Sequence, residues 1–250
     1  MNIVACIKRV PATETQPKIA PDGKGLDHGA VEYMLSFYDE IALEEAIRTK
    51  EAAGGEVTAL TLGPTDAAKE VRDCLARGAD KGMILVDPEW HARDARTTAK
   101  TLAAKLTELG ADLVFCGRQA TDRDNAAVGP MLATLLGWSC VTDVVELSID
   151  GTTATAKRES ERGIESFTLS LPAVITCQKG LNEPRYAGLK GIMAAKKKPI
   201  EEVEAAVADA ASEVVEASLP PARPEGRIDG EGPDAVPALL EALRTEAKVL

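Results

Sequence analysis

The sequence is poor in the residue types that build metal and catalytic centres. Of its 250 residues only 3% are aromatic, and it contains two histidines and five cysteines. The cysteines are scattered singly without a CxxC pair, so the sequence indicates neither a disulfide framework nor a metal site. The histidines, His28 and His91, lie far apart in the chain and have no acidic or cysteine cluster beside them. We therefore predict no metal ligand and no catalytic residue in this chain.

Basic charge and long apolar runs are also scarce. Lys and Arg number 29 against 40 Asp and Glu, a net charge of −11. This balance argues against a nucleic-acid binder, because phosphate backbones are held mainly by Lys and Arg. No run of about 18 apolar residues occurs, so we expect a protein that is not embedded in a membrane. The chain begins with a strand pattern instead of a charged leader and an apolar core, which predicts a cytoplasmic protein without a targeting segment.

Apolar runs of strand length alternate with helical patterns over the first half of the chain. Ala, Val, Leu and Ile carry most of the 45% apolar share, which is typical of helices packed on a parallel sheet. This order predicts an α/β fold with a doubly wound, mostly parallel, Rossmann-like sheet covered on both faces. The expected strands are 3–7, 57–62, 82–86 and 113–116, and the expected helices are 39–53, 66–77, 95–109 and 125–136.

An antiparallel hairpin is expected after this parallel part. Asp150-Gly151 is a strong signal for a tight turn, and it is flanked by apolar alternation on both sides. Leu171-Pro172 separates two further strands and indicates a break or a sheet edge. The expected strands are 141–149, 152–157, 165–170 and 173–177.

The last part of the chain has the composition of an extended arm. From Gly191 onward the core-like alternation is lost, and the stretch SLPPARPEGRIDGEGP is too rich in Pro, Gly and charge to fold alone. A final amphipathic helix is expected at about 233–247, with Val236, Leu239, Leu240 and Leu243 on one face. We therefore divide the chain into an α/β nucleotide-binding domain, 1–190, and a C-terminal arm and helix, 191–250. The helix needs a surface to pack on, either a partner subunit or the chain's own domain.

The segment Gly117–Pro130, GRQATDRDNAAVGP, is the most informative for function. It follows a strand and opens a helix at the carboxyl end of the expected sheet, where open α/β sheets bind ligands. The small residues Ala126, Ala127 and Gly129 let a ligand approach the first helical turn, whose free N–H groups favour a phosphate. The segment is neither GxGxxG nor a Walker loop, so an ordinary βα loop is an equal alternative.

The helix starts have candidate capping residues. Ser36 or Asp39 can cap the first long helix, and Asp124 or Asn125 can cap the helix that follows the Gly117 segment. Capping alone would account for these residues. Because the loops after the first and fourth strands often converge on one cleft in such folds, a shared adenine pocket is the sharper interpretation.

A third segment, Gly180–Ala187, combines residue types that anchor protein contacts. Leu181, Arg185 and Tyr186 follow a strand together with a proline. A structural loop is the alternative. The basic run Lys196–Lys198 is typical of a solvated turn, and a site for a phosphate or an acidic partner is the alternative there.

In these segments the sequence resembles the beta subunit of electron transfer flavoproteins, from Ile3 to Leu250. The motifs that carry the resemblance are ACIKRV at 5–10, YDEIALEEA at 38–46, the loop 117–130, and LNEPRYA at 181–187 with AKKK at 195–198. It implies a fold like that of the adenine nucleotide alpha-hydrolases and a heterodimer with an alpha subunit. It also implies an FAD bound mainly by alpha, which takes electrons from donor dehydrogenases and passes them to a quinone oxidoreductase or another acceptor.

The resemblance further implies that this chain buries an AMP between its loops. The implied docking loop for dehydrogenases consists of Leu181, Asn182, Glu183, Pro184, Arg185 and Tyr186. The implied nucleotide pocket consists of Cys6, Ser36, Phe37, Tyr38, Asp39, Leu62, Gln119, Ala120, Thr121, Asp122, Arg123, Asp124, Asn125, Ala126, Ala127, Val128, Gly129 and Pro130.

The family divides into members that hold AMP and electron-bifurcating members that hold a second FAD, which oxidises NADH, at the same place. Val128-Gly129-Pro130 and the ending 246–250 are similar to the bifurcating branch. Arg123, Asn125 and Ala127 depart from it, and the large Arg123 would crowd an isoalloxazine ring. We predict AMP, with a second FAD as the alternative. The βα order alone would also fit a stand-alone ATP- or AMP-binding module.

Overall fold

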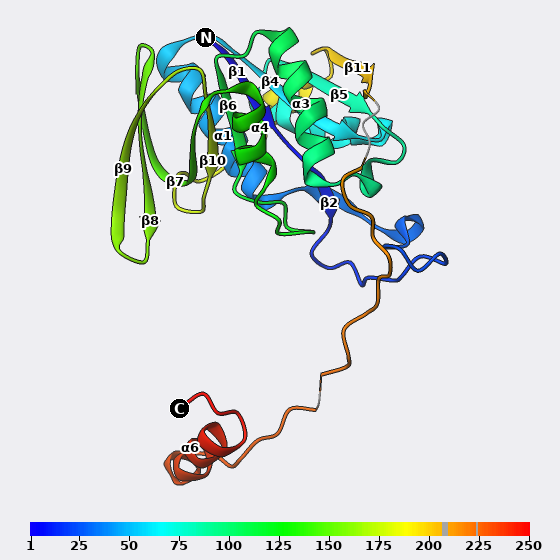
Figure 1. Cartoon of the computed structure of the whole chain (residues 1–250), viewed down its shortest axis with the longest axis vertical. Coiled ribbons are helices and arrows are strands. Elements are labelled where there is room, and N and C mark those ends of the chain that lie inside the picture. The colour runs from blue at the N-terminus through cyan, green and yellow to red at the C-terminus, as the bar shows by residue number, and fades with distance from the viewer. Residues whose placement is uncertain (207–209, 224) are drawn as a thin grey trace. The chain divides into compact units, whose positions relative to one another are not determined.

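The computed structural model describes residues 1–206, 210–223 and 225–250 (Figure 1). By their internal contacts these residues form two compact units, Met1–Ala217 and Ser218–Leu250. The first unit contains the sheet and its covering helices. The second contains one helix and the stretch of chain that leads to it, and each unit is described separately below.

The first unit is built on a nine-stranded sheet whose strand order is β11-β5-β4-β1-β6-β10-β7-β8-β9. The strands from β11 to β7 pair in parallel, and β8 and β9 extend the sheet in antiparallel pairing. This architecture confirms the predicted mostly parallel α/β fold with an added hairpin. The bounds are β1 Asn2–Cys6, β4 Glu56–Gly63, β5 Lys81–Val86, β6 Leu113–Gly117, β7 Ser139–Asp150, β8 Thr153–Ser160, β9 Gly163–Ser170, β10 Ala173–Cys177 and β11 Ile200–Glu204.

Helices cover both faces of this sheet, as the side chains of β1 show by pointing alternately to the two faces. Ile3 and Ala5 pack in one apolar cluster with Ile41 of α1. Val4 and Cys6 point to the other face, where they pack with side chains of α3 and α4. In Figure 1, α3 and α4 lie in front of the sheet and α1 lies behind it. The helices are α1 Phe37–Ala53, α2 Ala68–Arg77, α3 Ala95–Leu109, α4 Val128–Leu136 and α5 Leu189–Ala195.

The strand order reverses at β1, which fixes the place for a ligand. β1 pairs with β4 on one side and with β6 on the other, so the chain leaves β1 in one direction and returns to its opposite side. At such a switch point the loops that follow the two central strands diverge to opposite faces and leave a crevice at their carboxyl ends.

The body of the protein extends beyond the predicted boundary at Gly191. α5 packs against α2, and the guanidinium of Arg72 donates to the carbonyls of Ala195 and Lys198 at 2.6 and 2.8 Å. β11 then joins the sheet edge beside β5. Composition did not reveal this strand because its sequence, IEEVE, exposes its glutamates at a sheet edge. The break between the two units lies after Ala217, not at Gly191.

Shorter elements and turns connect these strands and helices. A two-stranded antiparallel sheet pairs β2, Arg9–Pro11, with β3, Tyr33–Leu35. The predicted hairpin turn lies between β7 and β8, with Gly151 at φ 58°. The break at Leu171-Pro172 precedes β10, which is an inner strand, so the sheet edge is β9 instead. The short 3-10 helices are η1 His28–Ala30, η2 Thr65–Ala67, η3 Trp90–Ala92 and η4 Pro233–Ala235.

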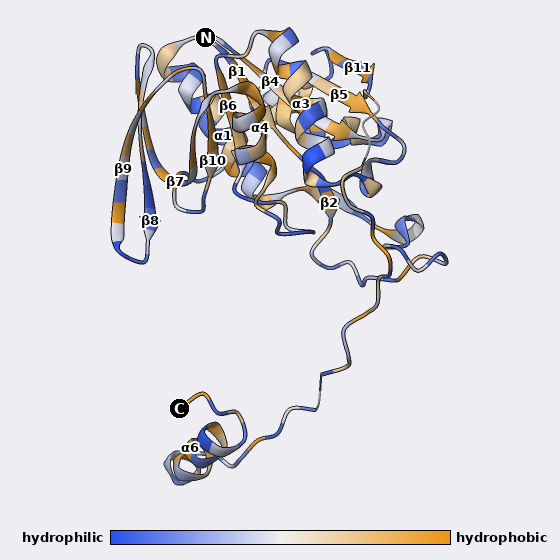
Figure 2. Cartoon of the chain, in the orientation of Figure 1, coloured by the Kyte–Doolittle hydropathy of each residue, from blue (hydrophilic) through white to orange (hydrophobic). Residues whose placement is uncertain are grey.

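The second unit contains the predicted amphipathic helix as α6, Val236–Thr245, directly after η4. Val236, Leu239 and Leu240 are exposed on this helix. In Figure 2 the apolar colour is concentrated in the central strands of the first unit, and α6 shows apolar and polar positions side by side. Among the described residues, no helix is long and apolar enough to cross a membrane.

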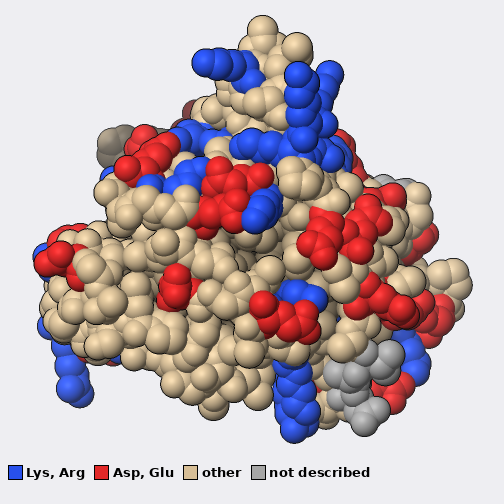
Figure 3. All heavy atoms as spheres, turned by 90° about the horizontal axis from the view of Figure 1, so that it is seen from above, with Lys and Arg blue, Asp and Glu red and all other residues tan. Residues whose placement is uncertain are grey.

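On the face that Figure 3 displays, the acidic side chains do not form one continuous patch. Acidic side chains form small groups separated by uncharged surface, and basic side chains are concentrated toward the upper edge of the view. Both signs are therefore available for contacts on this side of the molecule.

Candidate functional site

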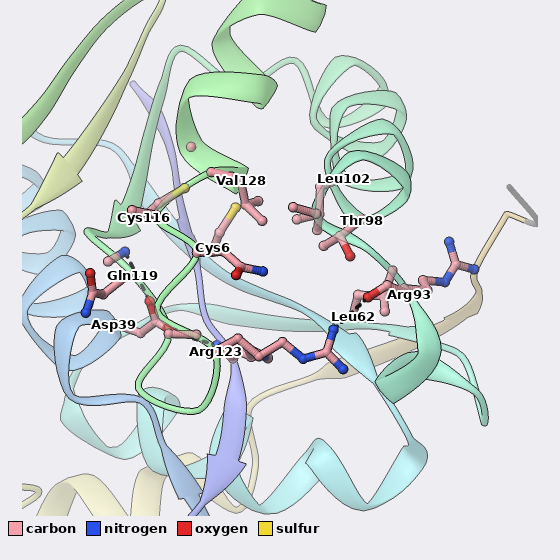
Figure 4. A pocket seen from close by; sticks show the side chains of 18 of the residues that line it. Cys6, Asp39, Leu62, Arg93, Thr98, Leu102, Cys116, Gln119, Arg123 and Val128 are labelled. Carbon is pink, nitrogen blue, oxygen red and sulfur yellow. Dashed lines mark hydrogen bonds between the residues drawn. The ribbon is translucent and has the colours of Figure 1, made fainter. Parts of the chain in front are cut away.

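A cavity opens at the switch point, between the carboxyl ends of β1 and β6 and the first turns of α3 and α4. In Figure 4 side chains from these separate elements, among them Cys6, Thr98, Leu102 and Val128, converge on the same space. The residues of the predicted pocket that line it are Cys6, Asp39, Leu62, Gln119, Ala120, Arg123, Asn125, Ala126, Ala127, Val128 and Gly129. Those that do not line it are Ser36, Phe37, Tyr38, Thr121, Asp122, Asp124 and Pro130.

The start of α4 differs from the prediction in a way that favours an anionic ligand. The helix begins at Val128 with Ala127 as its N-cap, so neither Asp124 nor Asn125 caps it. Asp124 and Ala126 instead adopt φ of 50°, a left-handed conformation that is uncommon for residues with a side chain. Among the described residues, no side chain bonds to the first N–H groups of α4. These groups therefore remain available to a phosphate at the positive end of the helix dipole.

Gly129 has a packing role that sequence reasoning did not assign. A Cβ at this position would lie 2.4 Å from Cγ2 of Thr176, a residue of β10. The missing side chain lets the first turn of α4 approach the sheet. It brings the N–H groups of this turn to the carboxyl ends of the strands, where the cavity lies.

Asp39 ties the two central strands together beneath the cavity. Its Oδ2 accepts the N–H of Lys8 at 2.8 Å, and its Oδ1 accepts the N–H of Gly117 at 3.0 Å. Of the two predicted capping candidates, Ser36 is the N-cap residue of α1 and Asp39 is not, because the helix begins two residues before Asp39, at Phe37. Ser36 makes no side-chain cap bond, and its Oγ accepts the N–H of Thr121 at 3.4 Å.

Burial has a large effect on this carboxyl group. It raises the pKa of Asp39 from 3.8 to about 7, and the bonds from Lys8 and Gly117 oppose the shift only in part. Gly117 must remain a glycine here, because its Cβ would lie 2.3 Å from Oδ1 of Asp39. The junction of β1, β6 and α1 is thus tightly packed around one buried acid.

Lys8 and Asp122 fasten the Gly117 segment to the end of β1. The Nζ of Lys8 lies 2.7 and 2.6 Å from the two carboxylate oxygens of Asp122. Burial lowers the pKa of Lys8, and the charge of Asp122 opposes that shift. This pair holds the loop beside the cavity, so Asp122 supports the site from outside the lining.

Arg123 connects the same loop to the opposite wall. Its guanidinium donates to the carbonyl of Arg93 at 3.0 Å and also to the carbonyl of His91. In Figure 4 its side chain extends along the lower side of the cavity toward Arg93. Arg93 is itself held by Asp87 and by the hydroxyl of Thr101, which is 2.8 Å away. The two walls are therefore joined through side-chain to main-chain bonds.

Sequence reasoning missed this second wall, the loop after β5 and the first turn of α3. Its lining residues are Trp90, His91, Arg93, Asp94, Ala95 and Thr98. Asp94 was a usable signal, because an aspartate before a helical pattern is a common N-cap. Its Oδ1 does accept the N–H of Thr97 at 2.7 Å. Ile7, Lys8, Leu102 and Cys116 also line the cavity and were missed. Gly117 and Arg118 line it as well; they lie in the predicted segment but were not assigned to the pocket.

The two histidines, distant in sequence, meet beside this wall. The ring centroids of His28 and His91 are 4.8 Å apart, and Tyr33 and Trp90 lie next to them. Burial lowers the pKa of His28, and His91 adds to the effect. Their separation along the chain did not indicate this contact.

Comparison with known proteins identifies the family of this chain. The family model for the electron transfer flavoprotein domain matches residues 25–208. The chain is 38% identical over 259 residues to the electron transfer flavoprotein subunit beta of Bacillus subtilis (strain 168), with 100% of both chains covered. It belongs to the electron transfer flavoprotein beta-subunit family.

Relatives from other organisms support the same family assignment. The mitochondrial electron transfer flavoprotein subunit beta of Oryza sativa subsp. indica is 39% identical over 258 residues, with 100% of both chains covered. The subunit beta of Thermoanaerobacterium thermosaccharolyticum is 37% identical over 257 residues, with 98% of both covered. The chain thus functions in electron transfer, and its family implies an alpha-subunit partner and a flavin in the complex.

In this electron transfer flavoprotein subunit the predicted docking loop is fastened to α1. The Nδ2 of Asn182 donates to the carbonyl of Ile41 and to Glu45, and the Arg185 guanidinium pairs with Glu44 and Glu51. Leu181 packs against the core and Pro184 is half-buried, whereas Glu183 is exposed.

Apolar surface is exposed just after that anchored part of the loop. Tyr186 is 92% exposed and Leu189 is 79% exposed. Lys196 and Lys197 are exposed nearby in sequence, but Lys198 is not a solvated turn residue. Its Nζ donates to the carbonyls of Leu75 and Ala79, at 3.1 and 2.5 Å, and so caps the end of α2.

Proposed function

We propose that this chain is the beta subunit of a heterodimeric electron transfer flavoprotein and that its cavity holds AMP. FAD held mainly by the alpha subunit would accept electrons from donor dehydrogenases and pass them to a quinone oxidoreductase or another acceptor. The observation that carries the AMP assignment is a cavity at the switch point whose walls include an uncapped helix N-terminus. The residues present fit an adenine nucleotide in three respects.

The first respect is the phosphate. The N–H groups of the first turn of α4 have no side-chain cap, and Gly129 brings them close to the strand ends. Anions bind at helix N-termini because N–H groups and the helix dipole both favour negative charge there. Arg123 and Lys8 also line the cavity and add positive charge.

The second respect is the base. Leu62, Leu102 and Val128 line the same cavity from three different elements. A purine ring needs apolar contacts on its faces, and mostly apolar pockets with a few polar groups are the usual sites for such ligands. We assign the base to these three side chains and the phosphate to the start of α4.

The third respect is size. The bonds from Arg123 to His91 and Arg93 connect the loop after β6 with the loop after β5. An isoalloxazine ring attached to the nucleotide would have to displace this side chain or pass beside it. A mononucleotide does not require that movement, so the arrangement favours AMP over a second FAD.

The surfaces left exposed support the heterodimer. α6 exposes Val236, Leu239 and Leu240, and the segment after the Leu181 loop exposes Tyr186 and Leu189. Exposed apolar surface of this kind marks protein contacts. We assign α6 and the arm to the alpha subunit, and the Leu181–Leu189 segment to donor dehydrogenases.

In this function the chain's own residues position the bound nucleotide and shield it. Electron transfer between flavins depends on their separation and on potentials set by surrounding charge and hydrogen bonds. A bound FAD supplies the redox chemistry. Asp39, Lys8 and Gly117 hold the ends of β1 and β6 in register beneath the nucleotide, and Arg123 keeps the two cavity walls joined.

The deciding experiment is a nucleotide count. The chain is co-expressed with its alpha subunit, and the purified heterodimer is denatured to release its bound nucleotides. We expect one FAD and one AMP per heterodimer. Two FAD and no AMP would establish the bifurcating alternative, which Val128-Gly129-Pro130 favours. Tight ATP binding by a chain that ignores the alpha subunit would instead indicate a stand-alone nucleotide-binding module.

A further inference from the structure

We propose that Cys6 and Cys116 form a thiol pair in the floor of the cavity that a peroxide oxidises reversibly to a disulfide. The pair lies outside the electron path assigned above. Its formation does not depend on the proposed function, whereas its effect on nucleotide binding does.

The first argument is the register of the two central strands. Cys6 ends β1 and Cys116 lies in β6, and the two residues are direct partners in the parallel pairing. Both side chains point to the face covered by α3 and α4, where they belong to the same apolar cluster. Neighbouring strands lie about 4.8 Å apart, within the range of Cα separations that disulfides bridge.

The second argument is access. Cys6 is 7% exposed and Cys116 is 6% exposed, and both line the cavity (Figure 4). A peroxide is small enough to enter a space that is shaped for a larger ligand. Cys74 and Cys177 pack in the cluster on the opposite face of the sheet, and Cys140 is half-buried away from the cavity lining. The pair at 6 and 116 is thus the one that shares a cavity.

The third argument concerns the protonation of the Cys116 thiol. A side-chain hydrogen bond with Cys6, followed by burial, raises the pKa of the Cys116 thiol well above its ordinary value. Cys116 therefore keeps its proton at neutral pH. Because a thiolate is the attacking species, the raised pKa of Cys116 disfavours this sulfur as the first to react, and we assign the resolving step to it.

The chemistry balances with a peroxide as the two-electron oxidant. The Cys6 thiolate attacks one oxygen of hydrogen peroxide, the O–O bond breaks, and a sulfenic acid forms while hydroxide takes up a proton to become water. The Cys116 sulfur then attacks the Cys6 sulfur, the S–O bond breaks, and the proton of Cys116 leaves in a second water molecule. Two thiols and one peroxide give one disulfide and two waters.

The disulfide would be reversible and would reshape the floor. Cβ atoms in a disulfide are closer than those of partners on neighbouring strands, so the bond must draw β1 and β6 together. A strained disulfide is more easily reduced by thiols. The movement occurs next to Lys8 and Gly117, whose N–H groups Asp39 holds at 2.8 and 3.0 Å. We expect it to weaken nucleotide binding roughly tenfold.

The test uses the heterodimer treated with hydrogen peroxide and digested with trypsin without reduction. Cys6 lies in the peptide 1–8 and Cys116 in the peptide 106–118. We expect these two peptides joined, about 2 Da lighter than their sum, and separated again by dithiothreitol. Cys6→Ser and Cys116→Ser should each abolish the joined product. Cys177→Ser, on the next strand but the opposite face, should leave it unchanged.

Two readouts keep this proposal separate from the proposed function. Both thiols remaining free under peroxide, or pairing with Cys140 or Cys177 instead, would overturn the thiol pair whatever nucleotide is bound. For the effect on binding, AMP affinity is measured by calorimetry on the nucleotide-free heterodimer before and after oxidation. A joined peptide with unchanged AMP affinity would overturn only the inference that the floor controls the ligand.

Discussion

The guanidinium of Arg123 donates a hydrogen bond to the main-chain carbonyl of Arg93, 3.0 Å away, and joins two loops that follow different strands. The acceptors on that wall are backbone atoms, so no substitution in the wall itself removes them. Arg123 is therefore the replaceable half of this connection, and its replacement tests what the connection does.

Replacing Arg123 by glycine should loosen the cavity and change its ligand preference. The loss of two hydrogen bonds between the walls is expected to weaken AMP binding roughly tenfold, at about 1.4 kcal/mol per decade. The space vacated by the side chain should raise the FAD count above one per heterodimer. Calorimetry and nucleotide counting measure the two effects. Arg162→Gly, in the exposed turn between β8 and β9, is the control, and equal AMP affinity in both variants would contradict the prediction.

Asp39 predicts a specific dependence of stability on pH. Burial raises its pKa in the folded state from 3.8 to about 7, so the folded chain keeps a proton that the unfolded chain has already lost between these values. The contribution of Asp39 to the free energy of unfolding is thus fully present below about pH 3.8 and is lost as the pH rises through about 7. A shift of about three pKa units corresponds to about 4 kcal/mol.

The Asp39→Asn variant lacks this titration. Its free energy of unfolding, measured by urea denaturation, should fall less than that of the natural chain between about pH 4 and about pH 8. Asp150→Asn, in the exposed hairpin turn, should keep the natural slope. Parallel curves for the natural chain and Asp39→Asn would show that this carboxyl group ionises as it does in the unfolded chain.

Gly117 predicts a steric effect. The Cβ of an alanine would lie 2.3 Å from Oδ1 of Asp39 and 2.8 Å from two atoms of Tyr38, so α1 must shift away from β6. Overpacking of this kind costs about 1–3 kcal/mol, and chemical denaturation should show it as a lower midpoint. Gly188→Ala is a matched control, because none of the described residues has an atom within 4 Å of its Cβ position. An unchanged midpoint for Gly117→Ala would show that the junction is more open than the contacts indicate.

Replacing Leu189 should slow reduction by the donor without changing the stability of the chain. It is 79% exposed at the start of α5, so alanine there removes little packing within the chain. If the exposed segment docks donor dehydrogenases, Leu189→Ala should lower the kcat/KM for reduction of the heterodimer roughly tenfold, as anchor residues do. The midpoint of unfolding should stay the same. Ile164→Ala, exposed on β9, is the control that should reduce neither quantity.

The order of strands and helices could be read from the sequence because its signals are local. Gly110 ends α3 and Gly137 ends α4 in left-handed conformations, as glycines after helical patterns predict. β11 could not be read in this way. Its position depends on pairing with β5, more than a hundred residues earlier in the chain, and its exposed glutamates resemble those of an arm.

The site was only half predictable for the same reason. The Gly117 segment and Cys6 could be named because a family pattern covers them. The wall around Arg93 and Asp94 becomes part of the cavity only when β5, β4 and β1 are placed side by side. Asp39 illustrates the limit in another way, because an acid at a helix start looks like a cap whatever its oxygens accept.

The length of the stretch from Ser218 to Gly232 limits how far α6 can reach if this helix binds the alpha subunit, as proposed above. This stretch has no regular helix or strand over its described residues, and it precedes η4 and α6. By its number of residues it can span at most roughly 50 Å, at about 3.3 Å per residue, and a tether of that length would hold α6 near a bound partner at roughly millimolar effective concentration. Under that proposal, once the first unit contacts the alpha subunit, α6 would search a confined volume instead of the whole solution. A weak contact by a short helix would then be enough to keep the two subunits together.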